Sequence, residues 1–324
     1  MSRPREDGII IGTLEPGPRN TIADVGVTVG HVTVERTGVT AVVPPSLPVP
    51  AGTAVLNGAG ELTGSLEIRE WGTLETPVYL TSTHAVGRVY DGAVSVAMAH
   101  DPRVGVDDVV IPVVGECDDS WLSDARVAHV QPGDVAQAVT DATADFEQGA
   151  VGAGAGMSCF DWKGGIGSSS RRADDHTVGV LLLTNFGTGE QLRVDGDPIG
   201  RLLDERPDTM PDPGGSCIAV VATDAPLTPP QLERLARRVG LGLARAGSVA
   251  HHGSGEIFVA LATATERSFA DRELDPLFQA VVDATEEAVL CSLWAAVDTT
   301  GREGRVVRAL PRAKVLELYR GRGR

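Results

Sequence analysis

The chain has 324 residues, of which 42% are hydrophobic and 22% are charged, so it can bury a sizeable core. This composition excludes wholesale disorder, and the length allows one large domain or two of ordinary size. Asp and Glu residues number 44 against 28 Lys and Arg residues, which gives a net charge of −16. Because nucleic-acid phosphates and anionic membrane surfaces both attract basic proteins, this balance argues against either partner.

The cysteine pattern and the N-terminus predict a cytoplasmic protein with reduced thiols. The four cysteines lie at positions 117, 159, 217 and 291, and none belongs to a CxxC pair or a zinc-type cluster. Residues 1–8 are charged and contain no apolar run of signal-peptide length. The sequence contains no run of about 18 apolar residues, the length that a membrane-spanning helix needs.

Short β-branched runs separated by glycine follow an N-terminal segment, residues 1–19, that we expect to be an exposed arm. These runs predict strands at 25–29, 32–34, 39–43 and 53–56. Residues 44–50 contain four prolines and predict a loop. Apolar residues at helical spacing predict a helix over 77–100. A buried strand at 109–114 follows, and then a helix over 134–148 with Asp134 as N-cap.

Strands and helices alternate in the second half of the chain. Strands are expected at 177–184, 217–222 and 256–263, and helices from Thr228 to about 246 and over 275–297. Between the first two of these strands, residues 193–215 form a long polar segment rich in Gly and Pro, which is uncommon unless it is functional or disordered. The alternation predicts sheets covered by helices, an α/β or α+β fold.

A serine at the start of a buried strand is the most informative chemical feature. The long polar segment ends in Gly215-Ser216, so a cut there would give Ser216 a free α-amine beside its own hydroxyl. An α-amine has a pKa of roughly 7.7–8 and can accept the hydroxyl proton. Glycine before the cut also tolerates the strained backbone that self-cleavage needs. The alternative is an ordinary turn before a strand.

A second candidate site is the glycine-rich turn that contains Ser254 and Glu256. These residues are two apart, so they share a face if the strand begins early, and the carboxylate could orient a hydroxyl that hydrogen-bonds Ser216. The alternative is a hairpin turn with solvated polar residues. Neighbouring His251 and His252 would point to opposite faces of a strand, so we expect no metal site.

Two further segments could contribute to a site. Asn185 ends the strand at 177–184, where its amide could donate to an oxyanion, although it could equally be a turn residue. Residues 149–156 have the glycine spacing of a dinucleotide loop but follow a predicted helix, so close backbone packing is the favoured interpretation. Four acids after a core strand could bind a substrate ammonium group or form an exposed acidic loop: Glu116, Asp118, Asp119 and Asp124.

Taken in order, these segments resemble the DmpA-like aminopeptidases, the family of L-aminopeptidase/D-esterases and β-aminopeptidases. The resemblance covers nearly the whole chain. It is carried by Asn20-Thr-Ile-Ala-Asp-Val25 with Val29-Gly-His31, Leu56-Asn-Gly58, Gly72-Thr-Leu-Glu-Thr-Pro77, Val114-Gly-Glu-Cys117, Gly152 to Gly156, Lys163-Gly-Gly-Ile-Gly167, Asn185-Phe-Gly187, Gly215-Ser216 and Gly253-Ser-Gly-Glu256.

The resemblance implies a four-layer αββα sandwich, similar to N-terminal-nucleophile hydrolases but with different connectivity. It implies a single domain, residues 1–324, that cuts itself into an α chain of residues 1–215 and a β chain of residues 216–324. It also implies a homo-oligomer of processed αβ units, and an activity that needs no cofactor and no metal.

The resemblance assigns roles to particular residues. Ser216 becomes the nucleophile and the new N-terminus, Ser254 and Glu256 support it, and Asn185 is the oxyanion donor. Glu116 falls where an anchor for the substrate's free amine is expected.

Two positions beside these are notable. Trp121 stands where relatives often have Tyr, so it could wall the pocket but cannot supply a tyrosine hydroxyl. Cys217 is expected to point into the core, on the opposite face of the strand from Ser216.

The implied function is release of N-terminal amino acids from small peptides or from aminoacyl amides and esters, with α-, β- and D-aminoacyl groups all open. An acyltransferase of the ornithine acetyltransferase type is an alternative, although those enzymes use Thr where this chain has Ser216. A non-enzymatic, glycine-rich ligand-binding protein is another, and it predicts an uncut chain.

Overall fold

The computed structural model describes residues 2–204, 215–264 and 269–321. The strands in these ranges are β1 (Thr28–Val34), β2 (Thr37–Val43), β3 (Val49–Gly58), β4 (Thr73–Leu74), β5 (Val78–Ser82), β6 (Val113–Cys117), β7 (Ser158–Cys159), β8 (Trp162–Lys163), β9 (Gly165–Ala173), β10 (His176–Asn185), β11 (Gly215–Thr223), β12 (Ser254–Ala262), β13 (Thr299–Thr300) and β14 (Val306–Val307). The α-helices are α1 (Ser65–Trp71), α2 (Val86–His100), α3 (Pro132–Thr140), α4 (Ile199–Leu202), α5 (Pro229–Ala236), α6 (Val239–Ala246), α7 (Leu274–Ala295) and α8 (Arg312–Arg320).

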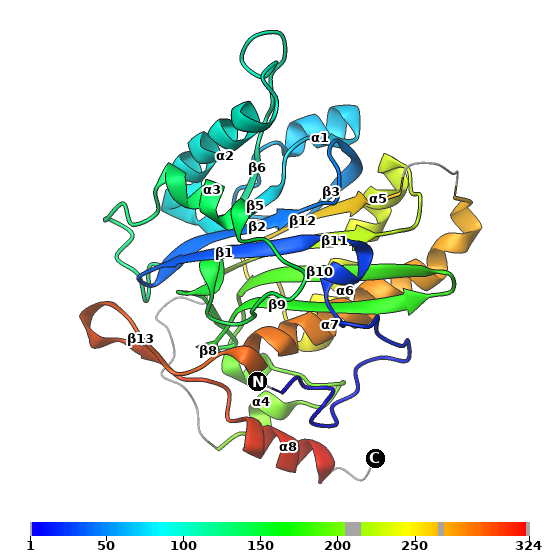
Figure 1. Ribbon diagram of the computed structural model, residues 1–324. Helices are drawn as coiled ribbons and strands as arrows, with labels where there is room; N and C mark the ends of the chain where they lie inside the picture. The colour runs from blue at the N-terminus through cyan, green and yellow to red at the C-terminus, as the bar shows by residue number, and fades with distance from the viewer. Residues whose placement is uncertain (1, 205–214, 265–268, 322–324) are drawn as a thin grey trace.

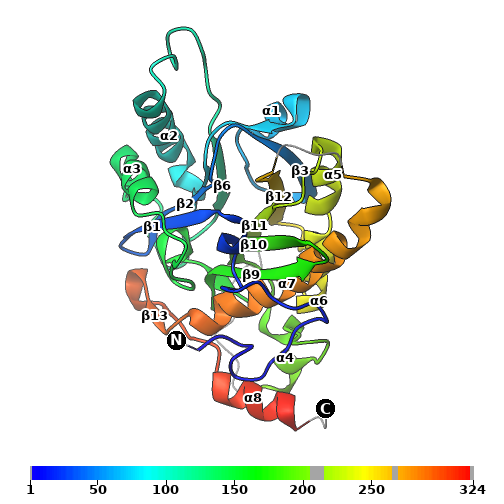
Figure 2. The same cartoon turned by 45° about the vertical axis from the view of Figure 1, so that its right-hand side comes forward.

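Two sheets are stacked between two layers of helices. Across the described ranges, one sheet has the order β1-β2-β5-β6 and the other the order β4-β3-β12-β11-β10-β9. Helices α2 and α3 cover the first sheet, and α5 and α7 cover the second, with α6 packed against α7 (Figures 1 and 2). The predicted four-layer αββα sandwich is confirmed.

Alternating side chains of the central strands fill two separate cores. Leu181 and Leu183 of β10 pack between the two sheets, whereas Val180 and Leu182 pack against the helices on the other side. Because successive strand residues point to opposite faces, a nearly continuous apolar run can serve both cores. Cys217 packs on the helix side, as predicted, and the four cysteines are buried and free of disulfides.

The strand directions bring several strand ends together at one edge of the sheets. β11 and β12 are parallel and begin at this edge with Gly215 paired to Ser254. β10 runs antiparallel to β11 and ends there, with Asn185 opposite Ser216. Three candidate residues that are far apart in the sequence therefore meet at one place.

The helix predicted over 77–100 is wrong in its first part. Val78–Ser82 is strand β5, paired with β2 and β6 inside the first sheet, and α2 begins only at Val86. An apolar run buried on both faces also satisfies a helical period, so the pattern could not distinguish the two. The strand predicted at 109–114 lies slightly later, at Val113–Cys117.

The helix predicted over 134–148 is shorter and begins earlier. α3 starts at Pro132, with Gln131 as its N-cap, and ends at Thr140. Asp134 occupies the third helical position, where its carboxylate accepts a hydrogen bond from the Gln131 backbone at 2.8 Å. It therefore completes a capping box instead of opening the helix.

The N-terminal segment is not an exposed arm, as the sequence suggested. Ile9 and Ile11 are fully buried and pack in the core beside α7, whereas Ile10 between them is 44% exposed. This three-residue alternation was too short to register as an apolar pattern, and it ties residues 1–19 to the rest of the fold.

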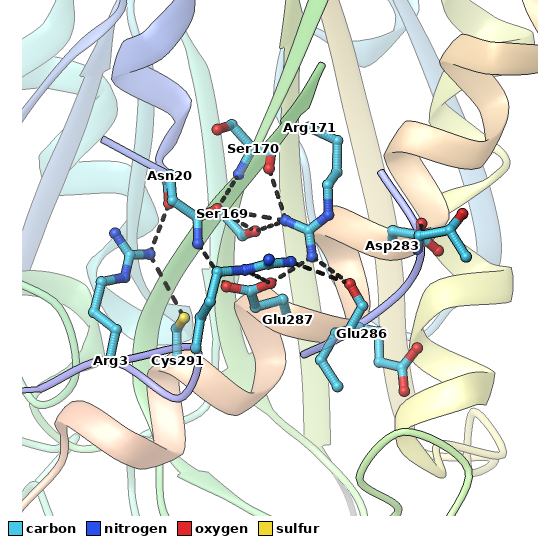
Figure 3. Close-up of polar contacts among 12 residues, drawn as sticks. Arg3, Asn20, Ser169, Ser170, Arg171, Asp283, Glu286, Glu287 and Cys291 are labelled. Atoms are coloured by element: carbon cyan, nitrogen blue, oxygen red, sulfur yellow. Dashed lines mark hydrogen bonds and ion pairs between the residues drawn. The ribbon is translucent and has the colours of Figure 1, made fainter. Parts of the chain in front are cut away.

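A buried ionic cluster also fastens the N-terminal segment (Figure 3). Arg171 of β9 and Glu287 of α7 are fully buried and form an ion pair. Asn20 Nδ2 donates a 2.5 Å hydrogen bond to Glu287, and Arg171 donates to the Ile11 carbonyl at 2.8 Å. Arg5 lies 3.5 Å from Glu287. The cluster thus joins the N-terminal segment, β9 and α7.

The helix predicted after Thr228 is divided into α5 and α6, and its start is as expected. Thr228 is the N-cap and forms a capping box with Gln231.

Part of the polar segment 193–215, residues 205–214, lies outside the described residues. No helix in the described residues is long and apolar enough to cross a membrane.

Candidate active site

Ser216 lies at the start of β11 and is 6% exposed. Its hydroxyl donates a 2.7 Å hydrogen bond to the carbonyl oxygen of Gly215, the residue before it. The Gly255 backbone N–H lies 3.4 Å from the same hydroxyl oxygen. The candidate nucleophile therefore contacts the carbonyl group of the peptide bond at which we predicted cleavage.

Only glycine fits at position 215. A Cβ atom there would lie 2.2 Å from the Asn185 carbonyl oxygen and 3.0 Å from the Phe186 Cα atom. Real side chains do not approach backbone atoms this closely. Close packing against the end of β10 thus explains the glycine.

Ser254 and Glu256 share one face of β12, as their spacing predicts, and the Ser254 hydroxyl donates to Glu256 Oε1. Glu256 is fully buried, and burial raises its pKa, although the bond from Ser254 opposes this shift. Glu256 Oε2 has no hydrogen-bond partner among the described residues. The hydrogen bonds of the described residues do not include one between the Ser254 hydroxyl and Ser216.

The side chain of Asn185 is fixed by two backbone groups. Its Oδ1 accepts a 3.0 Å bond from Ser158 N–H, and its Nδ2 donates at 2.8 Å to the Asp118 carbonyl. These contacts orient the amide so that its nitrogen faces the loop after β6, which contains Asp118. A primary amide has two N–H donors, so one remains for a developing oxyanion.

Glu116 is 3% exposed at the end of β6. Its Oε1 accepts a 2.9 Å bond from Glu61 N–H, and its Oε2 accepts a bond from the Thr83 hydroxyl. Burial raises the pKa of Glu116, whereas these two bonds lower it. A buried carboxylate held in one orientation is suited to bind an ammonium group.

Only part of the predicted acidic loop faces the pocket. Glu116 and Asp118 line it, together with Trp121. Asp119 is 1% exposed and lies against Gly156, and burial raises its pKa to about 7. Asp124 pairs with Arg126 at 2.9 Å outside the pocket. An acidic run cannot reveal which members turn inward.

The glycine-rich segment at 149–156 packs closely against other backbone, as favoured. A Cβ atom on Gly154 would lie 2.7 Å from the Ile166 nitrogen, and one on Gly156 would lie 2.3 Å from the Arg36 carbonyl oxygen. Buried Lys163 donates to three backbone carbonyls around this segment, Gly154 among them, and burial lowers its pKa to about 7. No pattern in the sequence indicated that this lysine is buried.

A tight hairpin that the sequence did not reveal forms another wall. β7 and β8 are joined by Phe160 and Asp161, both with positive φ values of 51° and 62°. Asp161 lines the pocket, accepts a 2.7 Å bond from Gly189 N–H, and has a pKa raised by burial. Such turns usually contain Asn or Gly, so Phe-Asp gave no recognisable signal.

These groups surround one pocket of about 590 Å³, within the range typical of small-molecule sites. It is lined by Ser216, Asn185, Glu116 and Trp121. Two arginines from the far end of the chain, Arg302 and Arg305, also line it, and nothing in the sequence indicated them. Ser254 and Glu256 are not among its lining residues, because their side chains point to the opposite face of β12 from Gly255, the residue paired with Ser216.

The layer order and the pocket at the strand ends are those of an α/β enzyme related to the N-terminal-nucleophile hydrolases. The model of peptidase family S58 matches residues 20–307, and the chain belongs to this family. It is an enzyme, a serine aminopeptidase, which removes the non-enzymatic alternative.

Three relatives illustrate the similarity. The β-peptidyl aminopeptidase BapA of Sphingosinicella microcystinivorans is 38% identical over 94% of this chain and 90% of its own. The PH0078 protein of Pyrococcus horikoshii OT3 is 41% identical, with a TM-score of 0.95 over the whole of both chains. The L-aminopeptidase D-Ala-esterase/amidase of Ochrobactrum anthropi, described as a new variant among the Ntn hydrolase fold, is 33% identical, with a TM-score of 0.90 over 98% of this chain and 99% of its own.

Proposed function

We propose that this enzyme releases N-terminal amino acids from small peptides and from aminoacyl amides and esters, through a Ser216 nucleophile that autoproteolysis exposes. The observation that carries the proposal is the 2.7 Å hydrogen bond from the Ser216 hydroxyl to the Gly215 carbonyl oxygen. The hydroxyl is thus already beside the bond that must be cut, in a pocket whose other groups suit amide hydrolysis.

Self-cleavage proceeds by transfer of the Gly215 acyl group from nitrogen to oxygen. Ser216 Oγ adds to the Gly215 carbonyl carbon, the C–N bond breaks, and the hydroxyl proton ends on the Ser216 nitrogen. Water then hydrolyses the ester and releases residues 1–215 and 216–324. Ser216 keeps its hydroxyl and gains a free α-amine.

In the processed enzyme that amine is the general base for the Ser216 hydroxyl. The hydroxyl attacks the carbonyl of the substrate's first amide or ester, and Asn185 Nδ2 stabilises the oxyanion. The Ser254–Glu256 pair supports the amine, and the unpartnered Glu256 Oε2 supplies an acceptor that is otherwise unused. Proton return to the leaving group, followed by attack of water, completes turnover.

Glu116 binds the free amine of the substrate and so makes the enzyme an exopeptidase. A Cβ atom on Gly60 would lie 3.1 Å from Glu116 Oε1 and 3.5 Å from the Gly255 Cα atom, so only a glycine separates this carboxylate from the strand beside Ser216. The BapA relative is named for β-peptides, and we propose that β-aminoacyl groups are accepted here also.

The test compares β-, L-α- and D-aminoacyl 4-nitroanilides, each with a free or an N-acetylated amine, on wild-type enzyme and on Ser216→Ala. We expect release of nitroaniline from free-amine substrates, a lower rate on acetylated ones, and none with the variant. Equal kcat/KM for free and acetylated substrates would refute the aminopeptidase specificity. Undiminished turnover by Ser216→Ala would refute the nucleophile.

We also propose that processed units assemble into a homo-oligomer. Apolar side chains are exposed on β3 and α6, where Val55, Leu56 and Leu241 are 60%, 55% and 58% exposed. Gly240 lies against Leu56, so these side chains belong to one region of the surface. Light scattering of the purified enzyme should give a multiple of the monomer mass, and Leu56→Glu should lower it. A monomer in the wild type would refute assembly.

A further inference from the structure

Two cations line the pocket of this acidic protein. Arg302 and Arg305 lie at the turn between β13 and β14, and both share the pocket with Ser216. The chain as a whole has a net charge of −16, so two arginines at this place need an explanation. The other ionisable residues that line the pocket are acids: Glu116, Asp118 and Asp161.

Both guanidinium groups are held in place but retain free donors. The Arg305 guanidinium stacks 4.4 Å from the centre of the Trp121 ring and donates to the Trp121 carbonyl at 3.3 Å. Glu303 accepts one bond from each arginine, at 2.9 and 2.8 Å. Arg302 also lies 3.9 Å from Asp124. Because a guanidinium carries five N–H donors, these contacts leave donors for a ligand.

The turn that carries the arginines is fixed against the loop after β6. Arg302 N–H donates to the Leu122 carbonyl at 2.8 Å, and a Cβ atom on Gly301 would lie 2.3 Å from the same oxygen. Arg36 Nε donates to the Thr300 carbonyl at 2.6 Å. The β13–β14 hairpin, which Figure 1 shows beside the end of α7, therefore presents its arginines in a set position.

The pocket is large enough to hold a substrate with two charged ends. Its volume of 590 Å³ is that of a sphere about 10 Å across, and two extended residues span at most about 7 Å. Glu116 lies beside Gly60, which itself lies against Gly255 on the strand next to Ser216, and Glu116 binds the ammonium end. The leaving group then extends away from Glu116, and the cations that line this pocket among the described residues are Arg302 and Arg305.

We propose that Arg302 and Arg305 bind the carboxylate of the leaving amino acid. The preferred substrates are then dipeptides, an aminoacyl group on an amino acid with a free carboxylate, instead of neutral amides. Arginine suits this task because its planar fork matches a carboxylate with two parallel hydrogen bonds. This inference deepens the proposed aminopeptidase function and rests on it.

The experiment compares an aminoacyl-glycine with the matching aminoacyl-glycinamide, which differ only in the terminal charge. On wild-type enzyme we expect kcat/KM to be at least 10-fold higher for the free carboxylate. Arg302→Gln and Arg305→Gln should each lower the ratio of kcat/KM for the free carboxylate to kcat/KM for the glycinamide. Arg308→Gln is the matched control, since Arg308 pairs with Asp298 and is not among the pocket-lining residues.

Failure of the carboxylate-binding proposal can be distinguished from failure of the aminopeptidase function on which it rests. Equal kcat/KM for the two substrates on wild-type enzyme would overturn the carboxylate site while leaving the aminopeptidase function intact. Equal losses on both substrates in the arginine variants would also overturn it, because that result indicates a structural role. Failure of wild-type enzyme on both substrates and on the aminoacyl 4-nitroanilides would overturn the proposed function itself.

Discussion

Glu116→Gln tests whether one buried carboxylate makes this enzyme require a free amine. Glutamine has the same shape, its oxygen can still accept from Glu61 N–H, and its nitrogen can donate to the Thr83 hydroxyl. We therefore expect the fold to survive and the charge alone to be lost. The prediction concerns the ratio of kcat/KM for free-amine and N-acetylated substrates.

The magnitude follows from the burial of Glu116, which is 3% exposed and therefore little screened by water. A hydrogen bond between charged groups contributes about 1.5–3 kcal/mol. This corresponds to about 10- to 150-fold in kcat/KM, which the variant should lose on free-amine substrates only.

The pH profile gives an independent readout. Burial raises the pKa of Glu116 above the ordinary value of 4.5. Protonation at low pH removes the negative charge, so kcat/KM for free-amine substrates should fall as the pH drops through a midpoint above 4.5. The Glu116→Gln variant should lack this part of the acid limb.

The assay is steady-state hydrolysis of paired free and acetylated aminoacyl 4-nitroanilides across pH. Glu61→Gln is the control, because Glu61 touches Glu116 through its backbone and is exposed. That variant removes a nearby charge but keeps Glu116 and its hydrogen bonds, so its ratio should fall much less than in Glu116→Gln. An unchanged ratio in Glu116→Gln would refute the amine-binding role.

Glu256→Gln should lower turnover by about 10²-fold or more with the fold intact, since the carboxylate assists proton transfer, and wild-type turnover would remove Glu256 from the mechanism. Gly215→Ala should slow self-cleavage, because its Cβ atom would lie 2.2 Å from the Asn185 carbonyl oxygen; equal accumulation of fragments on denaturing gels would contradict this. Glu287→Gln leaves the buried Arg171 without its ion-pair partner, at a cost of about 3–5 kcal/mol. The Glu287→Gln substitution should lower the unfolding temperature by about 10 °C in calorimetry. The control Asp298→Asn removes a charge from the exposed pair with Arg308 and should have little effect. Equal shifts in the two variants would contradict a stabilising role for the buried pair.

Spacing within one strand predicted the local geometry well. Ser254 and Glu256 share a face of β12 because strand side chains alternate, and two residues suffice to show it. Asn185 was placed at the end of a strand by its apolar run alone. The meeting of Asn185 with Ser216 depends on the antiparallel register of β10 and β11, which the sequence pattern does not reveal; the family resemblance had assigned only the roles of the two residues.

Long-range contacts could not be predicted from local patterns. Arg302 and Arg305 reach the pocket because their hairpin docks on the backbone of Leu122. A backbone contact of this kind leaves no trace in the pattern of side chains along the sequence. Asp161 faces inward because a turn of two residues with positive φ precedes β8. The residues 78–82 satisfied a helical period but became a strand, because a sheet buried on both faces imposes no alternation.

The central claim is that Ser216 becomes a free N-terminus, and intact mass with N-terminal sequencing tests it most directly. The account predicts two chains in purified active enzyme, residues 1–215 and the 109 residues from Ser216 to Arg324 (324 − 215 = 109), and a single chain in Ser216→Ala. Active wild-type enzyme that consists of one uncut chain of 324 residues would contradict the account.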